Sequence, residues 1–251
     1  MARIVGIHGA FHQLWGPHEV AGRWVPAIMD GLWHAGVTIE PSDVSMAFYG
    51  DLFRADPADG RPTDEELMDI AREAGLTEVI ESLAGSDGLA AISKAVGENT
   101  LRQTINQLGR YFADDDLRSA VQARLASVID DDTRVVIAHS MGTVVAYEAL
   151  SEYSDWPVET LLTIGSPLGG DYVFGHLRPT PVAERGSWPG SLEAWVNVAS
   201  VGDLACAEPR LAKCFDGPVE DLEVDNGHRA HDAEPYLNAA ATGAALAAAL
   251  S

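Results

Sequence analysis

The stretch of sequence that decides the fold is Val135-Val136-Ile137-Ala138-His139-Ser140-Met141-Gly142-Thr143-Val144-Val145. It opens with an apolar, β-branched run typical of a buried strand, and it ends in an apolar run that favours a helix. A serine between a strand and a helix is the context of a nucleophile elbow, a strained turn that exposes a catalytic hydroxyl. Such a turn needs small residues two positions before and after the serine, and here they are Ala138 and Gly142.

The chain on both sides of this segment alternates between strand and helix. Short apolar runs predict strands over residues 3–7, 43–49, 134–138, 158–164 and 192–199, and residues 218–224 are interpreted as the last strand. Helical spacing of apolar residues predicts helices over residues 18–35, 116–129, 140–153 and 233–250. This alternation favours an α/β fold with a mostly parallel sheet covered by helices on both faces.

Residues 51–113 interrupt the alternation. Glycines and prolines punctuate this segment, and the stretches between them have helical patterns. We therefore expect a single domain over residues 1–251 with a helical cap, or lid, inserted at 51–113. Such a cap would cover the sheet edge that carries Ser140, where it would exclude water and shape the substrate pocket.

The composition limits the classes of partner. The chain has 38 Asp and Glu against 16 Lys and Arg, a net charge of −22, and a phosphate backbone would repel it. The sequence shows no membrane span and no signal peptide, so we expect a cytoplasmic protein without stable membrane insertion. Cys206 and Cys214 lack the spacing of a redox pair or zinc site; we expect free thiols, which could pair only outside a reducing compartment. No metal or cofactor motif is present.

The segment around Ser140 resembles the α/β-hydrolase family, in particular its lipase-like and esterase-like members. The resemblance covers most of the chain apart from residues 51–113. A second matching segment is Thr160-Leu161-Leu162-Thr163-Ile164-Gly165-Ser166-Pro167-Leu168-Gly169, which is similar to the strand and loop after the nucleophile helix of lipase-like members. One departure is Ala138, where the family motif has glycine; alanine is the next smallest side chain and should still let the turn close.

The resemblance implies an oxyanion hole after the first strand, which runs into His8-Gly9-Ala10-Phe11-His12. In the family a His-Gly pair here begins the loop that supplies one oxyanion donor. The donors would then be the N–H of Met141 and that of Ala10 or Phe11. The alternative is a plain turn in which His8 is an ordinary interior histidine. We also expect His139 and Leu168 to contact the substrate.

The family order of catalytic residues along the chain is serine, then the acid, then histidine. Asp203 follows the second strand after Ser140, where the family's acid usually lies, and would orient the base. Asp171, one strand earlier, is the alternative acid. The loop before the last helix holds two histidines, of which His231 is favoured as the base because it directly precedes the helix, and His228 is the alternative.

These features predict a serine hydrolase that cleaves a carboxylic ester, or a related thioester or amide, through an acyl-enzyme on Ser140. The expected partner is a small-molecule ester or acyl substrate. An acyltransferase or a cyclising thioesterase would use the same triad, and a non-catalytic hydrolase-like binding protein is a third alternative. The sequence does not specify the acyl chain length, the physiological substrate or the oligomeric state.

Overall fold

The structure is a computed structural model that describes residues 2–54, 107–190 and 192–251. At its centre lies one sheet of six strands, in the order β2-β1-β3-β4-β5-β6, and every neighbouring pair is parallel. The strands are β1 (Ile4–Ile7), β2 (Val44–Ala47), β3 (Val135–His139), β4 (Thr160–Ile164), β5 (Ala194–Ser200) and β6 (Val219–Val224). The predicted α/β fold with a parallel sheet is confirmed.

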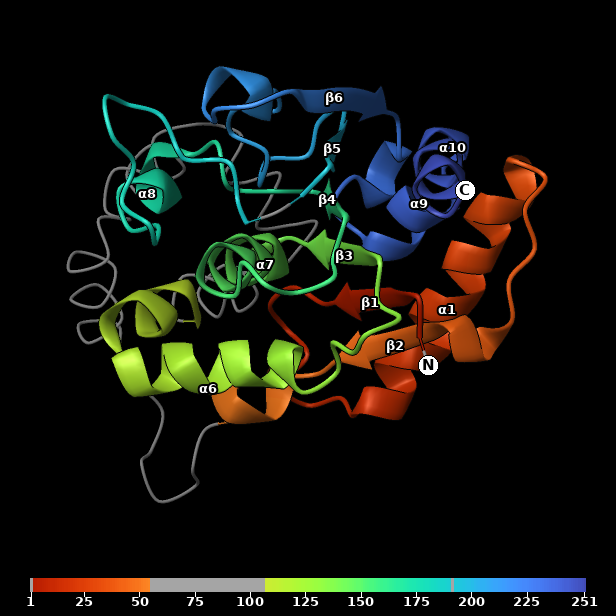
Figure 1. The fold of residues 1–251 in the computed structure, drawn as a ribbon, viewed down its shortest axis with the longest axis horizontal. Helices are drawn as coiled ribbons and strands as arrows, with labels where there is room; N and C mark the ends of the chain where they lie inside the picture. The colour runs from red at the N-terminus through yellow and green to blue at the C-terminus, as the bar shows by residue number, and fades with distance from the viewer. Residues whose placement is uncertain (1, 55–106, 191) are drawn as a thin grey trace.

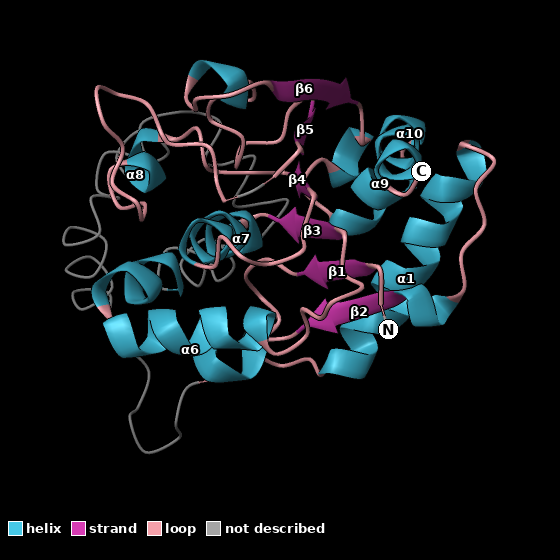
Figure 2. Cartoon of the chain, in the orientation of Figure 1, coloured by secondary structure: helices cyan, strands magenta, loops and turns pink. Residues whose placement is uncertain are grey.

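Helices cover both faces of the sheet (Figures 1 and 2). One face carries α1 (Pro17–His34), α9 (Ala233–Asn238) and α10 (Ala240–Ala249), and the other carries α6 (Asp115–Ala126) and α7 (Met141–Glu152). Shorter elements are α8 (Asp171–Phe174) and the 3-10 turns η1 (Pro41–Asp43), η2 (Gly50–Phe53), η3 (Leu211–Lys213) and η4 (Gly227–Arg229). None of the described helices is both long and apolar enough to cross a membrane.

The inner strands β1, β3, β4 and β5 read as apolar runs because they are buried on both faces, whereas the edge strands β2 and β6 are partly exposed. In β3 all residues are buried, and alternate side chains point to opposite faces of the sheet. Val135 and Ile137 belong to the apolar core under α1, α9 and α10, whereas Val136 and Ala138 belong to the core under α6 and α7. A strand with two buried faces reads as a continuous apolar run, which is the pattern seen in the sequence.

The parallel arrangement gathers the loops that follow the strands at one edge of the sheet. β3 lies between β1 and β4, with Ala138 beside Ile7 and His139 beside Ile164. The segments after β1, β3, β4 and β5 therefore leave the sheet side by side, at the edge where open α/β sheets bind their ligands.

The predicted helix over residues 233–250 is interrupted. Ala239 has an extended backbone, with φ −65° and ψ 137°, and it separates α9 from α10. Both short helices pack against α1. No glycine or proline marks the break in this alanine-rich stretch, so tertiary packing against α1 overrides the local helix propensity.

Most of the expected cap at residues 51–113 lies outside the described part of the chain. Its described ends are the turn η2, which overlaps its beginning, and residues 107–113, which are helical. The cap and the single-domain organisation therefore stay predictions. Both Cys206 and Cys214 are free thiols, as expected.

Candidate functional site

Ser140 lies in the tight turn between β3 and α7. Its backbone has φ 53° and ψ −128°, a conformation that residues other than glycine adopt only at a cost in strain. The turn is held from both sides: the N–H of Ser140 donates to the carbonyl of Ile164 at 3.1 Å, and its carbonyl accepts from the Thr143 N–H at 2.9 Å and hydroxyl at 2.7 Å. The strained serine is therefore fixed by the surrounding backbone.

The small residues around Ser140 have a direct steric reason. A Cβ atom on Gly142 would lie 2.5 Å from the carbonyl oxygen of His8 and 2.8 Å from that of Ile7, so the end of β1 passes against this turn. A Cβ on Gly9 would lie 2.7 Å from the Cβ of Ser140. The loop after β1 and the turn after β3 are thus packed backbone to backbone.

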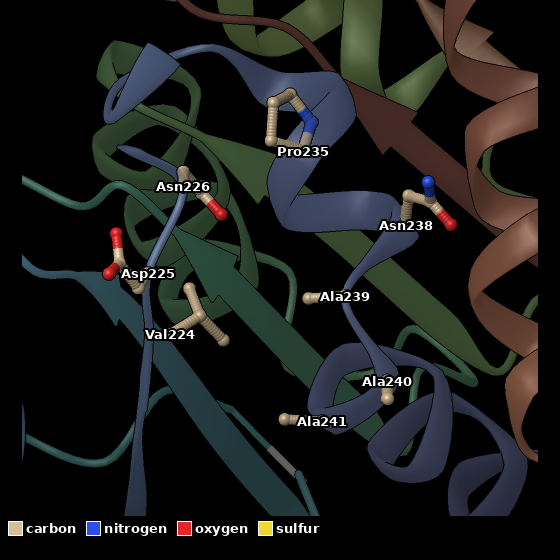
Figure 3. A pocket seen from close by; sticks show the side chains of 8 residues that line it. All are labelled: Val224, Asp225, Asn226, Pro235, Asn238, Ala239, Ala240 and Ala241. Atoms are coloured by element: carbon tan, nitrogen blue, oxygen red, sulfur yellow. The ribbon is translucent and has the colours of Figure 1, made fainter. Parts of the chain in front are cut away.

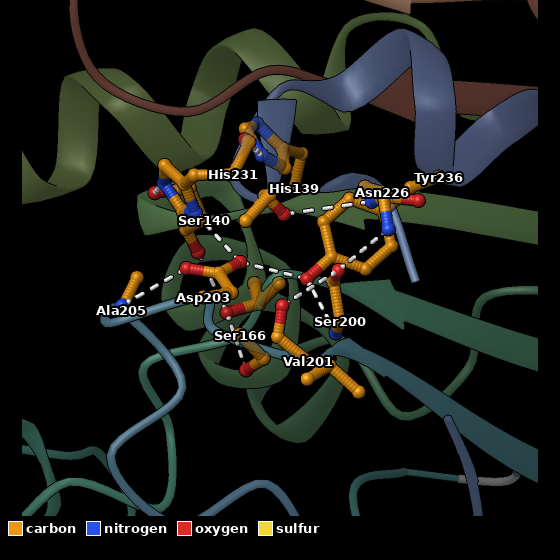
Figure 4. A network of polar contacts seen from close by, with 12 residues as sticks. His139, Ser140, Ser166, Ser200, Val201, Asp203, Ala205, Asn226, His231 and Tyr236 are labelled. Carbon is orange, nitrogen blue, oxygen red and sulfur yellow. Dashed lines mark hydrogen bonds and ion pairs between the residues drawn. The ribbon is translucent and has the colours of Figure 1, made fainter. Parts of the chain in front are cut away.

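Three side chains from separate loops form one chain of hydrogen bonds (Figure 4). The Oγ of Ser140 lies 3.0 Å from Nε2 of His231, and Nδ1 of His231 lies 2.9 Å from Oδ2 of Asp203. Because a carboxylate only accepts hydrogen bonds, Nδ1 carries the proton and Nε2 of the neutral ring is left to accept from the serine hydroxyl. The Asp203 side chain has no exposed surface, while 36% of the His231 side chain is exposed.

Asp203 is held as a carboxylate despite its burial. Burial opposes ionisation, but the hydrogen bond and charge interaction with His231 and the hydrogen bonds from Tyr236 and the Ala205 N–H together lower the pKa of Asp203. The Ala205 N–H reaches Oδ1 at 3.0 Å, and the Tyr236 hydroxyl reaches Oδ2 at 2.7 Å. The acid is therefore ionised at neutral pH and faces the base in a fixed orientation.

The structure separates the favoured acid and base from their alternatives. Asp171 is exposed at the start of α8, and His228 is exposed in η4. The imidazole next to Ser140 is that of His231, and its carboxylate partner is Asp203. The catalytic roles of these residues stay predictions. Within the described ranges no group of three or more His, Cys, Asp or Glu could hold a metal ion.

His8 orients the backbone of the loop after β1. Its Nε2 accepts a hydrogen bond from the Tyr49 N–H at 3.2 Å, so Nδ1 must carry the proton, which it donates to the carbonyl of Gly9 at 2.7 Å. Burial, with a smaller effect of nearby His12, lowers the pKa of His8 to about 3. His8 is thus a neutral interior histidine, and it also fixes the peptide group between Gly9 and Ala10.

Of the expected oxyanion donors, Met141 directly follows Ser140, and the loop that carries Ala10 and Phe11 approaches Ser140 at Gly9. In a trans peptide the C=O of Gly9 and the N–H of Ala10 point in opposite directions, so the bond from His8 turns the Ala10 N–H away from His8. Phe11 has a positive φ of 73°. In the described part of the chain, neither Ala10 nor Phe11 donates its N–H to another backbone carbonyl. Met141 is the first residue of α7, where the N–H has no intrahelical acceptor.

The two residues expected to contact substrate, His139 and Leu168, are both buried. Leu168 has no exposed surface and belongs to the core under α6 and α7. Its contact with substrate stays a prediction. His139 is buried too, and its Nε2–H donates to the carbonyl of His231 at 2.8 Å. Burial and, to a smaller extent, nearby His231 lower the pKa of His139, so its ring is neutral. His139 therefore holds the backbone of His231 in the loop between β6 and α9.

Tyr236 also belongs to this network, although the sequence pattern did not indicate it. This residue of α9 is fully buried, and its hydroxyl contacts Asp203. The signal available in the sequence was an aromatic residue with a polar tip shortly after His231, a position where a buried hydroxyl needs a partner. Such a residue is also an ordinary core residue, so the pattern alone did not single it out.

A shallow depression of about 470 Å³ lies between the end of β6 and the two closing helices (Figure 3). It is lined by Val224, Asp225, Asn226, Pro235, Asn238, Ala239, Ala240 and Ala241. This lining includes none of the three hydrogen-bonded side chains. The depression therefore lies apart from the Ser140 site.

No protein-family model matches the chain, and no curated protein matches it. One solved structure that is similar is an esterase domain from a Rhodothermus marinus protein, with 20% sequence identity and a TM-score of 0.30. The match covers 66% of this chain and 81% of that chain. A likeness at this level carries no conclusion about activity, so function has to be argued from the site itself.

Proposed function

We propose that the protein is a serine hydrolase that cleaves a carboxylic ester through an acyl-enzyme on Ser140. The observation that carries this proposal is the unbroken hydrogen-bonded chain from Ser140 through His231 to Asp203, with distances of 3.0 and 2.9 Å. A serine hydroxyl is a weak nucleophile until a base within hydrogen-bond reach can take its proton. Here the base is within reach, and a buried carboxylate orients it.

In the proposed reaction Ser140 Oγ attacks the ester carbonyl carbon while His231 Nε2 takes the hydroxyl proton. The imidazolium that forms is stabilised by ionised Asp203 and then protonates the departing alcohol oxygen, which leaves the acyl group on Ser140. Water repeats the sequence on the acyl-enzyme: His231 takes a proton from it, and the carboxylic acid departs as Oγ recovers its proton. The partial exposure of the His231 side chain supports water as the acceptor.

The negative oxygen of the tetrahedral intermediate needs hydrogen-bond donors that are already in place. The proposed donors are the N–H of Met141, at the positive end of α7, and the N–H of Ala10 or Phe11. The close packing of Gly9 on Ser140 supports this assignment. Removing one such donor in other enzymes costs about 10²–10³ in kcat, so the loop after β1 contributes strongly to the proposed rate.

The direct test is turnover of p-nitrophenyl esters of increasing acyl length by the wild-type protein and by Ser140→Ala. We expect Ser140→Ala to lower kcat by about 10⁴–10⁶-fold with an unchanged melting temperature. Ser119→Ala, which removes an exposed serine on α6, is the matched control and should keep full activity. Turnover that survives in Ser140→Ala, or no turnover of any ester by intact wild-type protein, would contradict the proposal.

A further inference from the structure

A fourth side chain joins the hydrogen-bonded chain at its buried end (Figure 4). The hydroxyl of Tyr236 lies 2.7 Å from Oδ2 of Asp203, and it also lies 2.8 Å from the backbone nitrogen of Ser200 at the end of β5. Tyr236 is fully buried. Its hydroxyl therefore links three parts of the molecule: the helix α9, the end of β5 and the proposed catalytic acid.

The direction of both hydrogen bonds is fixed by chemistry. The Ser200 N–H can only donate, so the phenolic oxygen accepts from it, and the phenolic hydrogen is left to donate to the Asp203 carboxylate. Burial, reinforced by Cys206 and Asp203, raises the pKa of Tyr236 well above its ordinary value. The hydroxyl consequently stays protonated and remains a donor throughout the working pH range.

Tyr236 and His231 compete for the same carboxylate oxygen. Both bond to Oδ2 of Asp203, at 2.7 and 2.9 Å, while Oδ1 accepts from the Ala205 N–H. A hydrogen bond from Tyr236 draws negative charge on Oδ2 toward the phenol, and less of that charge then acts on the imidazole. The strength of the Tyr236 bond is thus coupled to how tightly the carboxylate holds a proton on His231.

No lysine or arginine forms an ion pair with Asp203 among the described residues. Burial raises the pKa values of Tyr172 and Cys206, so both are neutral, and His139 is neutral as described above. The share of the Asp203 charge that acts on His231 is therefore set mainly by the hydrogen bonds that the carboxylate accepts. Among the described residues, the titratable groups that face Asp203 or His231 are His139 at the end of β3, Tyr172 in α8, Cys206 in the loop after β5 and Tyr236 in α9.

We propose that Tyr236 is a positioning residue: its hydroxyl holds Oδ2 of Asp203 in place and reduces the stabilisation that this carboxylate gives to the protonated imidazole of His231. The inference rests on the proposed function, because it concerns the base of that reaction. Without the hydroxyl, the charge on Oδ2 would act on His231 alone and would favour the imidazolium. The base would then become available only at a higher pH.

The first experiment compares Tyr236→Phe with wild type through the pH profile of kcat/KM for p-nitrophenyl acetate. We expect the acidic limb to move up by about 0.5–1 pH unit, with KM changed less than about twofold. Tyr147→Phe is the matched control, because Tyr147 is also fully buried but its hydroxyl donates to the Ser187 carbonyl at 3.1 Å, away from the triad. An acidic limb that stays in place in Tyr236→Phe would overturn the inference.

The second experiment changes the donor strength in the opposite direction and keeps the phenolic hydroxyl in place. Replacing Tyr236 by 3,5-difluorotyrosine makes the phenol a stronger donor, so the acidic limb should move to lower pH, opposite to Tyr236→Phe. A purely structural role predicts no such reversal. Because the fluorinated variant keeps both hydrogen bonds, it decides the question even where Tyr236→Phe fails to fold.

An NMR titration of the His231 ring in resting protein gives a readout that needs no turnover. The ring signal is assigned by its loss in His231→Gln, and its midpoint should rise in Tyr236→Phe and fall in the fluorinated variant. Midpoints that do not move would overturn the inference while leaving ester hydrolysis intact. Conversely, shifted midpoints in a protein without esterase activity would support the role of Tyr236 and refute the proposed function.

Discussion

Two buried carboxylates lie in or near the helix α7, and their hydrogen-bond partners differ in kind. Glu148, within α7, pairs with the guanidinium of Arg118 through both carboxylate oxygens and also accepts hydrogen bonds from Tyr111 and Gln122. Asp203, near the start of α7, pairs with a neutral imidazole and has no lysine or arginine ion-pair partner in the described residues. The charge of Glu148 is thus neutralised permanently, whereas that of Asp203 is neutralised only when His231 holds an extra proton.

Under the proposed function, this difference separates a structural carboxylate from a catalytic one. The Glu148 network ties α6 and α7 to residues 107–113 and to the loop after α8, where the Arg178 N–H donates to Oε1 at 3.0 Å. Such a buried ion pair fixes the packing of these elements. In the proposed reaction, a buried carboxylate without a cationic side chain beside it, such as Asp203, would instead stabilise the positive charge that forms on His231. Substitutions at the two sites should therefore affect different properties.

The largest expected effect is on activity at the Asp203 site. Asp203→Asn should lower kcat/KM by about 10⁴-fold, because an amide cannot hold the imidazole in the required tautomer with the same charge. The melting temperature should change little. Ester turnover and circular dichroism of the same preparations check both halves of this expectation. Full activity in Asp203→Asn would show that Asp203 has no catalytic role that Glu148 lacks.

The next largest effect is on stability at the Glu148 site. Arg118→Met leaves the carboxylate of Glu148 buried and unpaired, so we expect a loss of about 3–5 kcal/mol in the free energy of unfolding. The activity of the protein that remains folded should fall less than about threefold. The double variant Arg118→Met/Glu148→Leu is the control and should recover most of the stability, as measured by urea denaturation. A single variant as stable as wild type would show that the pair does not hold the packing.

Buried neutral histidines add a pH dependence to the stability. The pKa of His8 is lowered to about 3 by burial and, less, by His12. The unfolded chain takes up this proton below about pH 6.5, so the free energy of unfolding should fall by up to about 1.4 kcal/mol per pH unit from pH 6.5 toward 3. At pH 5 the contribution of His8 amounts to about 2 kcal/mol relative to pH 8.

The variant His8→Asn should remove this part of the slope, and urea denaturation at pH 8 and pH 5 measures it. Asp203 acts in the same direction but at lower pH: its lowered pKa adds stability above the pKa of the unfolded carboxyl, about 3.9, and this is lost as pH falls through the folded-state value. The two contributions therefore occupy different pH windows. A slope in His8→Asn equal to that of wild type between pH 8 and pH 5 would show that His8 is not the group responsible.

The smallest expected effect is at the alternative base. His228 is exposed in η4, and it lies outside the hydrogen-bonded chain. His228→Ala should change kcat/KM less than about twofold, whereas His231→Ala should lower it by several orders of magnitude. The same ester assay distinguishes the two histidines. Equal losses in both variants would show that the resting geometry does not identify the base.

Much of this architecture could be predicted from the sequence because it depends on local patterns. Buried parallel strands read as apolar runs, and the small residues at Ala138 and Gly142 mark a turn that must pass the end of β1. The order of serine, acid and histidine pointed to Asp203 and His231, which the structure brings within hydrogen-bond reach of each other and of Ser140.

The features that could not be predicted depend on tertiary contacts. The break at Ala239 has no breaker residue, and it arises where α9 and α10 both pack on α1. The pairing of Arg118 with Glu148 joins residues 30 positions apart on separate helices. His139 donates its hydrogen bond to a backbone carbonyl. Every residue has such a carbonyl, so no residue type in the sequence indicates this contact.

The central claim, that Ser140 is an activated nucleophile, is tested most directly by labelling with a fluorophosphonate and locating the adduct by peptide mass spectrometry. We predict one adduct per folded molecule, on Ser140, and none on Ser140→Ala. The rate should fall by orders of magnitude in His231→Ala but not in Arg118→Met, once corrected for folded protein. A folded wild-type protein that leaves Ser140 unmodified, or that reacts equally fast without His231, would contradict the account.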